Sequence, residues 1–233
     1  MPVPSLLVSD LGSMSYAAAL ELQRDVARRR ISGEIDQDVL LLVEHPHVVT
    51  LGRAAKQASL VATPELLRAR GVEVFEVERG GDVTYHGPGQ LVGYPIFDLK
   101  RHRKDLHWYL RQVEESLIVA LGTFGIPAGR NPGYTGVWVG ADGDRWQRKI
   151  ASIGVHARDW VTWHGFALNV HTDLSFFDLM VPCGIADVQM TSIASELAPQ
   201  GIEPSDVRQA IAGAFGRVFE LTPVSGAAVW SPA

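Results

Sequence analysis

Cysteine is almost absent from this 233-residue chain, and its one example is Cys183. A single thiol excludes an intramolecular disulfide and any metal site built from several cysteines. The sequence also has no apolar run long enough to span a bilayer. Its first ten residues lack the basic and apolar segments of a secretory signal. We therefore expect a cytoplasmic protein that does not bind a membrane.

Positive charge is scarce as well. The chain has 21 Lys and Arg against 26 Asp and Glu, and its formal net charge is −5. This balance argues against nucleic-acid binding. The positive charge gathers in two short runs, residues 28–30 and residues 100–104. Such runs are usually solvated faces, but the second could also dock an acidic protein partner.

No internal repeat, low-complexity linker or clean boundary divides the chain, so we expect one domain over residues 1–233. Hydrophobic periodicity and turn signals predict the elements. The predicted helices are residues 15–30, 64–70, 105–124 and 205–219, with a helical turn at 175–180. The predicted strands are residues 39–43, 72–78, 91–97, 136–139, 149–156 and 164–170. We expect an α/β or α+β fold, with a mixed, largely antiparallel sheet flanked by helices.

Residues 79–90 have the densest mixture of glycine and reactive side chains in the chain. Four glycines and a proline alternate there with Arg, Asp, Thr, Tyr, His and Gln. Glycine lets backbone N–H groups approach a ligand, and polar groups on a loop between strands are well placed to bind one. A hairpin that needs glycine for its turns is the plainer interpretation. The mixture favours a binding site without naming the ligand.

Lys149 stands out by its phase in a predicted strand. Residues two apart in a strand share a face, which predicts that Lys149 lies on the apolar side of Ala151 and Ile153. A lysine in that place either extends its amine to solvent at the strand end or is partly desolvated. Burial favours the neutral form of an amine, which can act as a base.

Cys183 lies between Pro182 and Gly184, which is typical of a turn rather than of a core strand. Most lone cysteines are inert buried thiols. On a turn, however, a thiol beside a base or a cation can act as a nucleophile. A hydrolase that pairs Cys183 with a histidine is one interpretation, and the candidate partners are His156, His164 and His171. No metal site is expected, since His45 and His47 have no third ligand at a useful spacing.

Several motifs together resemble the lipoyl(octanoyl) transferase family. The resemblance runs from the first predicted helix to at least Glu196. The motifs are His45-Pro46, Thr50-Leu51-Gly52-Arg53, Arg79-Gly80-Gly81, Thr84-Tyr85-His86-Gly87-Pro88-Gly89-Gln90-Leu91, Tyr94-Pro95-Ile96, residues 133–139, Lys149-Ile150-Ala151-Ser152-Ile153-Gly154, residues 165–169 and Pro182-Cys183-Gly184-Ile185. Residues 141–148 and the chain after Gln200 match no motif of the family.

The resemblance implies a fold, an activity and a set of site residues. The implied fold is that of the biotin and lipoate ligases. The implied activity moves an octanoyl group from octanoyl-acyl carrier protein to one lysine of a lipoyl domain, the first step of protein lipoylation. Cys183 would carry the acyl group as a thioester, with Lys149 as its catalytic partner. The implied substrate-binding residues are Arg79, Gly80, Gly81, Asp82, Val83, Thr84, Tyr85, His86, Ser152, Ile153, Gly154, Gly165, Phe166 and Ala167.

The same resemblance implies no cofactor. Neither ATP nor a metal is expected, because the acyl group arrives on the phosphopantetheine of the carrier protein. The expected acceptors are the lipoyl domains of 2-oxoacid dehydrogenase acyltransferase subunits and the glycine cleavage H protein. We expect a monomer. Ile153, Phe166 and Leu168 are candidates to line the acyl chain, although core packing is their ordinary role.

Two rival interpretations remain on the same fold. One is an ATP-dependent lipoate–protein ligase, which shares a strand lysine but needs no thiol. The other is a non-catalytic relative that only binds acyl groups or lipoyl domains. Cys183 in its turn and the Tyr85-His86-Gly87-Pro88-Gly89 motif favour the transferase over the ligase. The presence of both Cys183 and Lys149 speaks against the non-catalytic relative.

Overall fold

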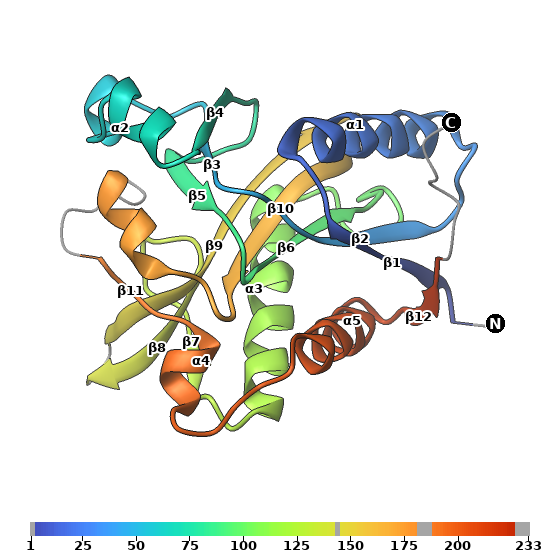
Figure 1. Cartoon of the computed structure of the whole chain (residues 1–233). Coiled ribbons are helices and arrows are strands. Elements are labelled where there is room, and N and C mark those ends of the chain that lie inside the picture. The colour runs from blue at the N-terminus through green and yellow to red at the C-terminus, as the bar shows by residue number, and fades with distance from the viewer. Residues whose placement is uncertain (1–2, 143–144, 181–187, 227–233) are drawn as a thin grey trace.

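A large mixed sheet forms the centre of the computed structural model, which describes residues 3–142, 145–180 and 188–226 (Figure 1). Its strands are β1 (Ser5–Ser13), β2 (Asp38–Glu44), β6 (Gln90–Ile96), β7 (Ala128–Gly129), β8 (Val137–Asp142), β9 (Arg145–Arg158), β10 (Val161–Asn169), β11 (Gln189–Met190) and β12 (Thr222–Ser225). The strand order is β12-β1-β2-β6-β10-β9-β8-β7, with β11 paired to β9. Pairing is parallel at β12–β1, β1–β2 and β11–β9, and antiparallel elsewhere. The predicted mixed, largely antiparallel sheet is confirmed.

A smaller sheet of three strands lies beside it. Its order is β4 (Glu73–Glu76), β3 (Val48–Leu51) and β5 (Val83–His86). Around it lie the short helices η1 (Gln57–Ser59), α2 (Pro64–Ala69) and η2 (Leu174–Leu179). Strand β5 falls inside the segment that was predicted as a loop, so that prediction was wrong for residues 83–86. The partner strand that makes β5 possible is β3, more than 30 residues earlier in the chain.

Helices cover both faces of the large sheet (Figure 1). Helix α1 (Tyr16–Ser32) packs on β6 and β10 from one side. Helices α3 (Leu106–Thr123) and α5 (Pro204–Phe219) pack on each other and share a core with the opposite face. The short α4 (Ile193–Leu197) joins that second side. We call these the α1 face and the α3/α5 face.

Strand β2 explains why a continuous apolar run predicts a central strand. Its side chains alternate between the two cores: Leu40 and Leu42 join the α3/α5 core, whereas Val39, Leu41 and Val43 join the α1 core. A strand that is buried on both faces has no position left for a polar residue. The long helices also follow their predicted ends, because Ser15 and Asp105 accept N-cap hydrogen bonds from Ala18 N–H and Trp108 N–H.

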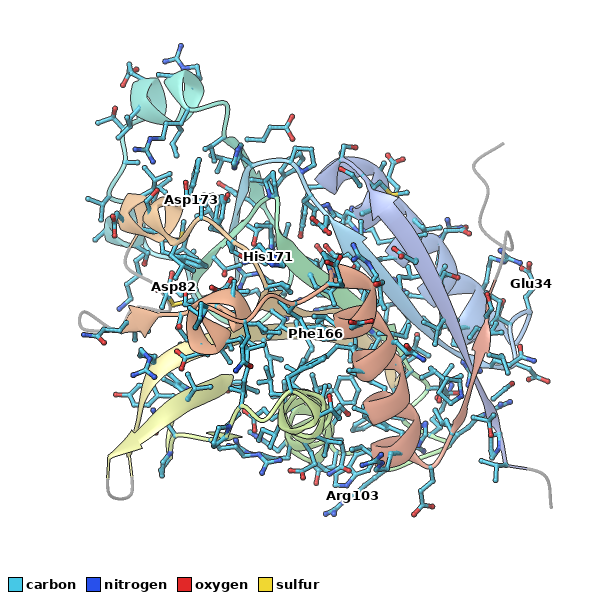
Figure 2. All side chains as sticks on the ribbon, turned by 60° about the horizontal axis from the view of Figure 1, so that its bottom comes forward. Glu34, Asp82, Arg103, Phe166, His171 and Asp173 are labelled. Carbon is cyan, nitrogen blue, oxygen red and sulfur yellow. The ribbon has the colours of Figure 1, made fainter. Side chains whose placement is uncertain are left out.

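The basic run at residues 100–104 does not form a free positive patch. The side chains of Lys100 and Arg103 pair with Asp98 and Asp105, and those of Arg101 and His102 contact Asp36 and Asp38. Figure 2 places Arg103 at the edge of the molecule, away from Asp82 in the Gly-rich segment. The structure therefore gives no support to this run as a docking surface.

Among the described residues, no helix combines the length and the apolar character that crossing a membrane would require.

A buried ion pair joins the C-terminal end of α1 to β2. Arg30 donates to Asp38 Oδ1 at 3.1 Å, and both side chains are almost fully buried. Arg30 also donates to the carbonyl oxygen of Ile35 at 3.1 Å. A charge in such a place is tolerated only because its partner is present.

We expect Arg30→Leu to lower the free energy of unfolding by about 3–5 kcal/mol, because the buried Asp38 carboxylate would lose its guanidinium partner. It would keep only its contacts with His102 and the Asp98 N–H. Urea denaturation measures the change. The matched control is Arg28→Leu on the same helix, whose exposed pair with Asp25 is worth at most about 1 kcal/mol. Equal losses in the two variants would contradict the assignment.

Candidate active site

Strand alternation sorts the Gly-rich segment into two sets of side chains. Val83 and Tyr85 point into the small core between the three-stranded sheet and η2. The Tyr85 ring stacks on Phe176, and its hydroxyl lies 2.7 Å from His47 Nδ1. Thr84 and His86 point the other way, into a cavity. Of the four predicted binding residues in β5, the structure therefore brings two to the cavity and places two in the core.

The cavity lies on the α1 face of the large sheet and has a volume of about 20 Å³. Three predicted segments meet there, although each comes from a different strand or loop. The cavity is lined by Tyr16, Arg79, Thr84, His86, Val92, Tyr94, Ser152, Gly154, His164, Gly165, Phe166 and Ala167. Eight of these residues belong to the predicted substrate-binding set, so the segments that the sequence singled out do converge in space.

Gly80, Gly81 and Asp82 anchor the Gly-rich segment to its neighbours. Gly80 N–H donates to the carbonyl oxygen of Val155 in β9 at 2.8 Å. The carbonyl oxygens of Gly81 and Asp82 accept from the N–H groups of Ala54 and Gly52. The Asp82 carboxylate accepts from the Ser59 hydroxyl at 2.9 Å. These residues position the segment and do not line the cavity.

Arg79 precedes these residues in the chain, and its side chain lines the cavity. Its guanidinium donates to the hydroxyl and the carbonyl oxygen of Thr50 and to the carbonyl oxygen of Gly80. Two glycines leave room for it. A Cβ at Gly52 would lie 2.8 Å from Arg79 Nη1, and one at Gly154 would lie 3.2 Å from Arg79 Cδ.

The candidate acyl-lining residues lie on the wrong face. Ile153, Phe166 and Leu168 belong to, or pack against, the α3/α5 core. The Phe166 ring stacks on Phe215, with 5.6 Å between the ring centroids. Ser152 and Ala167, which are paired across β9 and β10, line the cavity on the α1 face instead. For Ile153 and Leu168 core packing was the correct interpretation. Phe166 also packs its ring in that core, although the residue contributes to the lining of the cavity.

Burial keeps the side chains around the cavity uncharged. Burial raises the pKa of Tyr16 to about 12 and lowers the pKa of His86 to about 3. The pKa of His164 is also lowered by burial, although the neighbouring Glu78 opposes this shift. Tyr16 and Tyr94 were not predicted as site residues, and His164 was predicted only as a candidate partner of Cys183. The signal for Tyr94 was available, since it falls in one of the quoted motifs, but its face could not be read from the sequence.

Lys149 lies in β9 with 1% of its surface exposed, so of the two alternatives the structure shows the desolvated lysine and not one that reaches solvent. The predicted face was wrong. Lys149 pairs with Trp138 of β8, and its Nζ lies 5.3 Å from the centroid of the Trp138 ring. The residues on either side of Trp138, Val137 and Val139, point into the α3/α5 core. Lys149 and Trp138 therefore point to the opposite, α1 face.

A β-bulge is the physical reason. The β8–β9 register shifts between Val137 and Trp138, so that Val137 pairs with Ala151 while Trp138 pairs with Lys149. The extra residue, Ile150, reverses the alternation. As a result Lys149 shares a face with Ser152 and Gly154, which line the cavity. The rise of a strand places Lys149 about 10 Å from Ser152 along β9.

The chain that follows residues 181–187 returns to Lys149. Strand β11 pairs in parallel with β9 so that Met190 is opposite Lys149, and Thr191 N–H donates to the Lys149 carbonyl oxygen at 3.0 Å. Cys183, the predicted nucleophile, lies outside the described residues. Its pairing with Lys149 stays a prediction, and so does the alternative pairing with His156, His164 or His171.

His45 and His47 do not approach a metal site. His45 Nε2 lies 2.7 Å from the Tyr94 hydroxyl, and His47 contacts Tyr85. Among the described residues, no group of three or more His, Cys, Asp and Glu side chains could hold a metal ion.

Comparison with known proteins gives close relatives along nearly the whole chain. Residues 15–216 match the model of the lipoyl protein ligase A/B catalytic domain. A Solibacter usitatus protein named octanoyltransferase is 48% identical over 221 residues, which are 94% of this chain and 95% of that protein. A Myxococcus xanthus octanoyltransferase is 50% identical over 93% of this chain. This chain spans 60% of the length of the Myxococcus protein.

Solved structures agree on the fold. A lipoate-protein ligase A bound with ATP superposes with a TM-score of 0.73 at 16% identity, covering 96% of this chain and 88% of that one. A bipartite lipoate protein ligase from Thermoplasma acidophilum gives 0.74 at 18% identity, covering 95% and 86%. At such identities the likeness concerns the fold alone, and it confirms the predicted lipoate ligase-like fold.

We expect Gly154→Ala to loosen the Gly-rich segment from β9. The new Cβ would lie 2.7 Å from the Gly80 carbonyl oxygen, so the segment must shift, at a cost of about 1–3 kcal/mol in stability. Amide hydrogen exchange at residues 79–82 should become faster. Gly213→Ala is the control, because nothing lies within 4 Å of its Cβ, and a helical alanine is neutral or stabilising by up to about 1 kcal/mol. Unchanged exchange in Gly154→Ala would refute the role of this contact.

Proposed function

Since this chain belongs to the family of the lipoyl protein ligase A/B catalytic domain, we propose that it is an octanoyltransferase that acts on lipoyl domains. The acyl group comes from octanoyl-acyl carrier protein, and the acceptor is one lysine of the lipoyl domain. The acceptors are the lipoyl domains of 2-oxoacid dehydrogenase complexes and the glycine cleavage H protein. Relatives near 50% identity that carry the name octanoyltransferase support this activity.

The observation that carries the proposal is the convergence of three motifs at one cavity with few charges and a buried lysine on the same face. The motifs contribute Thr84 and His86, Ser152 and Gly154, and Gly165 and Ala167. Lys149 joins this face through the bulge in β9. Walls with few charges suit an acyl chain, because apolar surface gains free energy when it leaves water. The cavity has a volume of about 20 Å³, so the lining side chains must move apart to admit the chain.

We propose that Cys183 carries the acyl group. In the first half-reaction its sulfur attacks the thioester carbonyl carbon, and the bond from that carbon to the pantetheine sulfur breaks. The thiol proton of Cys183 passes through Lys149 Nζ to the departing pantetheine thiolate. One thioester replaces another, so the step needs no ATP. The supporting observation is that the chain following Cys183 returns as β11 directly beside Lys149.

In the second half-reaction the lipoyl-domain lysine attacks the same carbon. The bond to Cys183 breaks, an amide forms, and the amine proton returns to the Cys183 sulfur through Lys149. A free lysine amine has a pKa of about 10.4, so only roughly one molecule in a few thousand is neutral at pH 7. A base that removes its proton is worth about 10²–10⁴-fold in rate. Lys149 supplies this base away from bulk water, since its side chain is 1% exposed.

Incubation with octanoyl-acyl carrier protein in the absence of ATP should add one octanoyl group to the protein, at Cys183. Intact-mass and peptide mass spectrometry measure the adduct. Cys183→Ser should lose the thioester adduct. Native protein that stays unmodified without ATP but lipoylates a lipoyl domain when ATP and free lipoate are supplied would instead identify a ligase.

Lys149→Met should keep the packing on Trp138 but slow acyl-enzyme formation by about 10²–10⁴-fold, because the proton acceptor is lost. Single-turnover mass spectrometry at several times measures the rate. Lys100→Met is the matched control, since its amine is partly exposed and pairs with Asp98. A Lys149→Met enzyme that acylates at the native rate would remove Lys149 from the mechanism.

A further inference from the structure

A chain of buried side-chain amides links the Gly-rich segment to the strand that carries Lys149. His86 Nδ1 lies 2.9 Å from Gln90 Oε1, and Gln90 Nε2 lies 2.9 Å from Asn169 Oδ1. Asn169 Nδ2 lies 2.9 Å from the Thr191 carbonyl oxygen. Thr191 N–H donates in turn to the Lys149 carbonyl oxygen. His86, Gln90, Asn169 and Thr191 are all buried. We call this chain of contacts the amide relay.

Two backbone carbonyl oxygens fix the direction of every hydrogen bond in the relay. The Thr191 carbonyl oxygen can only accept, so the Asn169 atom facing it must be the NH₂ nitrogen, and Asn169 Oδ1 must face Gln90. The Tyr85 carbonyl oxygen, 3.2 Å from Gln90 Nε2, fixes the Gln90 amide in the same way. The two anchors are independent and agree. Gln90 Oε1 therefore faces His86.

The tautomer of His86 follows from this direction. An amide oxygen cannot donate, so His86 Nδ1 must carry the hydrogen of the bond to Gln90. A neutral imidazole has one N–H, which leaves Nε2 as an acceptor. The surroundings keep the ring neutral: burial lowers the pKa of His86 to about 3, and the positive charge of Arg79 also opposes protonation. Tyr16 stacks on the ring and limits its rotation.

We propose that Gln90 and Asn169 are positioning residues, which hold His86 as the Nδ1–H tautomer with Nε2 as an acceptor in the cavity, and which fix the strand after Cys183 beside Lys149. Nothing in the sequence analysis assigned a role to either amide. This inference rests on the proposed function for its substrate, but the tautomer is a property of the free protein.

An acceptor at His86 Nε2 calls for an N–H donor on the ligand. The octanoyl chain has no such group, whereas the pantetheine arm has amide N–H groups and the lipoyl-domain lysine has an amine. Both sources offer the same hydrogen bond. The two half-reactions tell them apart, because only the first involves pantetheine and only the second involves the acceptor lysine.

The first experiment reads the tautomer in the free native protein. Long-range ¹H–¹⁵N correlation spectra of ¹⁵N-histidine-labelled protein should show His86 with a protonated Nδ1 and an unprotonated Nε2 from pH 8 down to pH 5. The exposed His107 gives an internal reference signal. A protonated Nε2, or a doubly protonated His86 at pH 6, would overturn the proposal even if the protein is an active octanoyltransferase.

The second experiment breaks the relay without changing its volume. Gln90→Met should remove the Nδ1–H preference of His86 and lower kcat/KM about 10- to 100-fold, as expected for lost buried hydrogen bonds. Gln90→Glu keeps an acceptor for Nδ1–H but cannot donate to Tyr85 or Asn169. Its carboxylate should let His86 become protonated near neutral pH.

Rates of acyl-enzyme formation are compared for octanoyl-pantetheine and for octanoyl-ethanethiol thioester, which has no amide.

The control is Thr162→Val, which also removes buried hydrogen bonds of β10 but far from the relay. It should lose stability, measured by thermal unfolding, without changing the His86 spectrum. A Gln90→Met effect confined to octanoyl-pantetheine assigns the donor to pantetheine. An effect confined to transfer from the acyl-enzyme assigns it to the lysine. A native His86 spectrum and native rates in folded Gln90→Met would refute the relay.

Discussion

The contact between the Gly-rich segment and β9 is the constraint on which the site depends. Gly154 has no side chain, so the Gly80 carbonyl oxygen and the Arg79 side chain can lie directly on the strand. The hydrogen bond from Gly80 N–H to Val155 fixes the segment there. Because the segment is held at this point, the next residues can form β5 and point Thr84 and His86 toward Ser152 and Ala167. The cavity depends on the close approach of Gly80 to Gly154, and the side chains that line it lie around this contact.

The features that the sequence predicted well depend on local signals. The ends of α1 and α3 follow from the N-cap residues Ser15 and Asp105. The strand at residues 39–43 follows from an apolar run whose side chains fill two cores at once. The convergence of residues 79–86, 152–154 and 165–167 was predicted from motifs, and the cavity brings most of these residues together. The functional residues of each motif lie within a short segment, so the motif can be recognised from the sequence alone.

The features that the sequence did not predict depend on partners far along the chain. Side chains in β9 stop alternating between the two faces at Lys149, because a β-bulge lies opposite Val137 and Trp138. No residue type in the sequence indicates this bulge. Strand β5 needs β3 as its partner. The side chains of residues 100–103 contact acidic residues, two of which lie more than 60 residues away. The direction of the amide relay likewise depends on the Thr191 carbonyl oxygen. Strand register, strand pairing and hydrogen-bond direction depend on tertiary contacts, so the local sequence does not determine them.

The charge state of the cavity bears on the choice between transferase and ligase. At neutral pH burial keeps Tyr16, Tyr94, His86 and His164 uncharged. Arg79 is then the only cation among the lining residues, and its guanidinium donates to Thr50 and Gly80. A nucleotide triphosphate needs several cations or N–H donors around its phosphates, whereas an acyl chain needs none. Within the part of the chain that the structure describes, a wall with a single cation favours a thioester donor over an adenylate, and this argument does not depend on the thiol of Cys183.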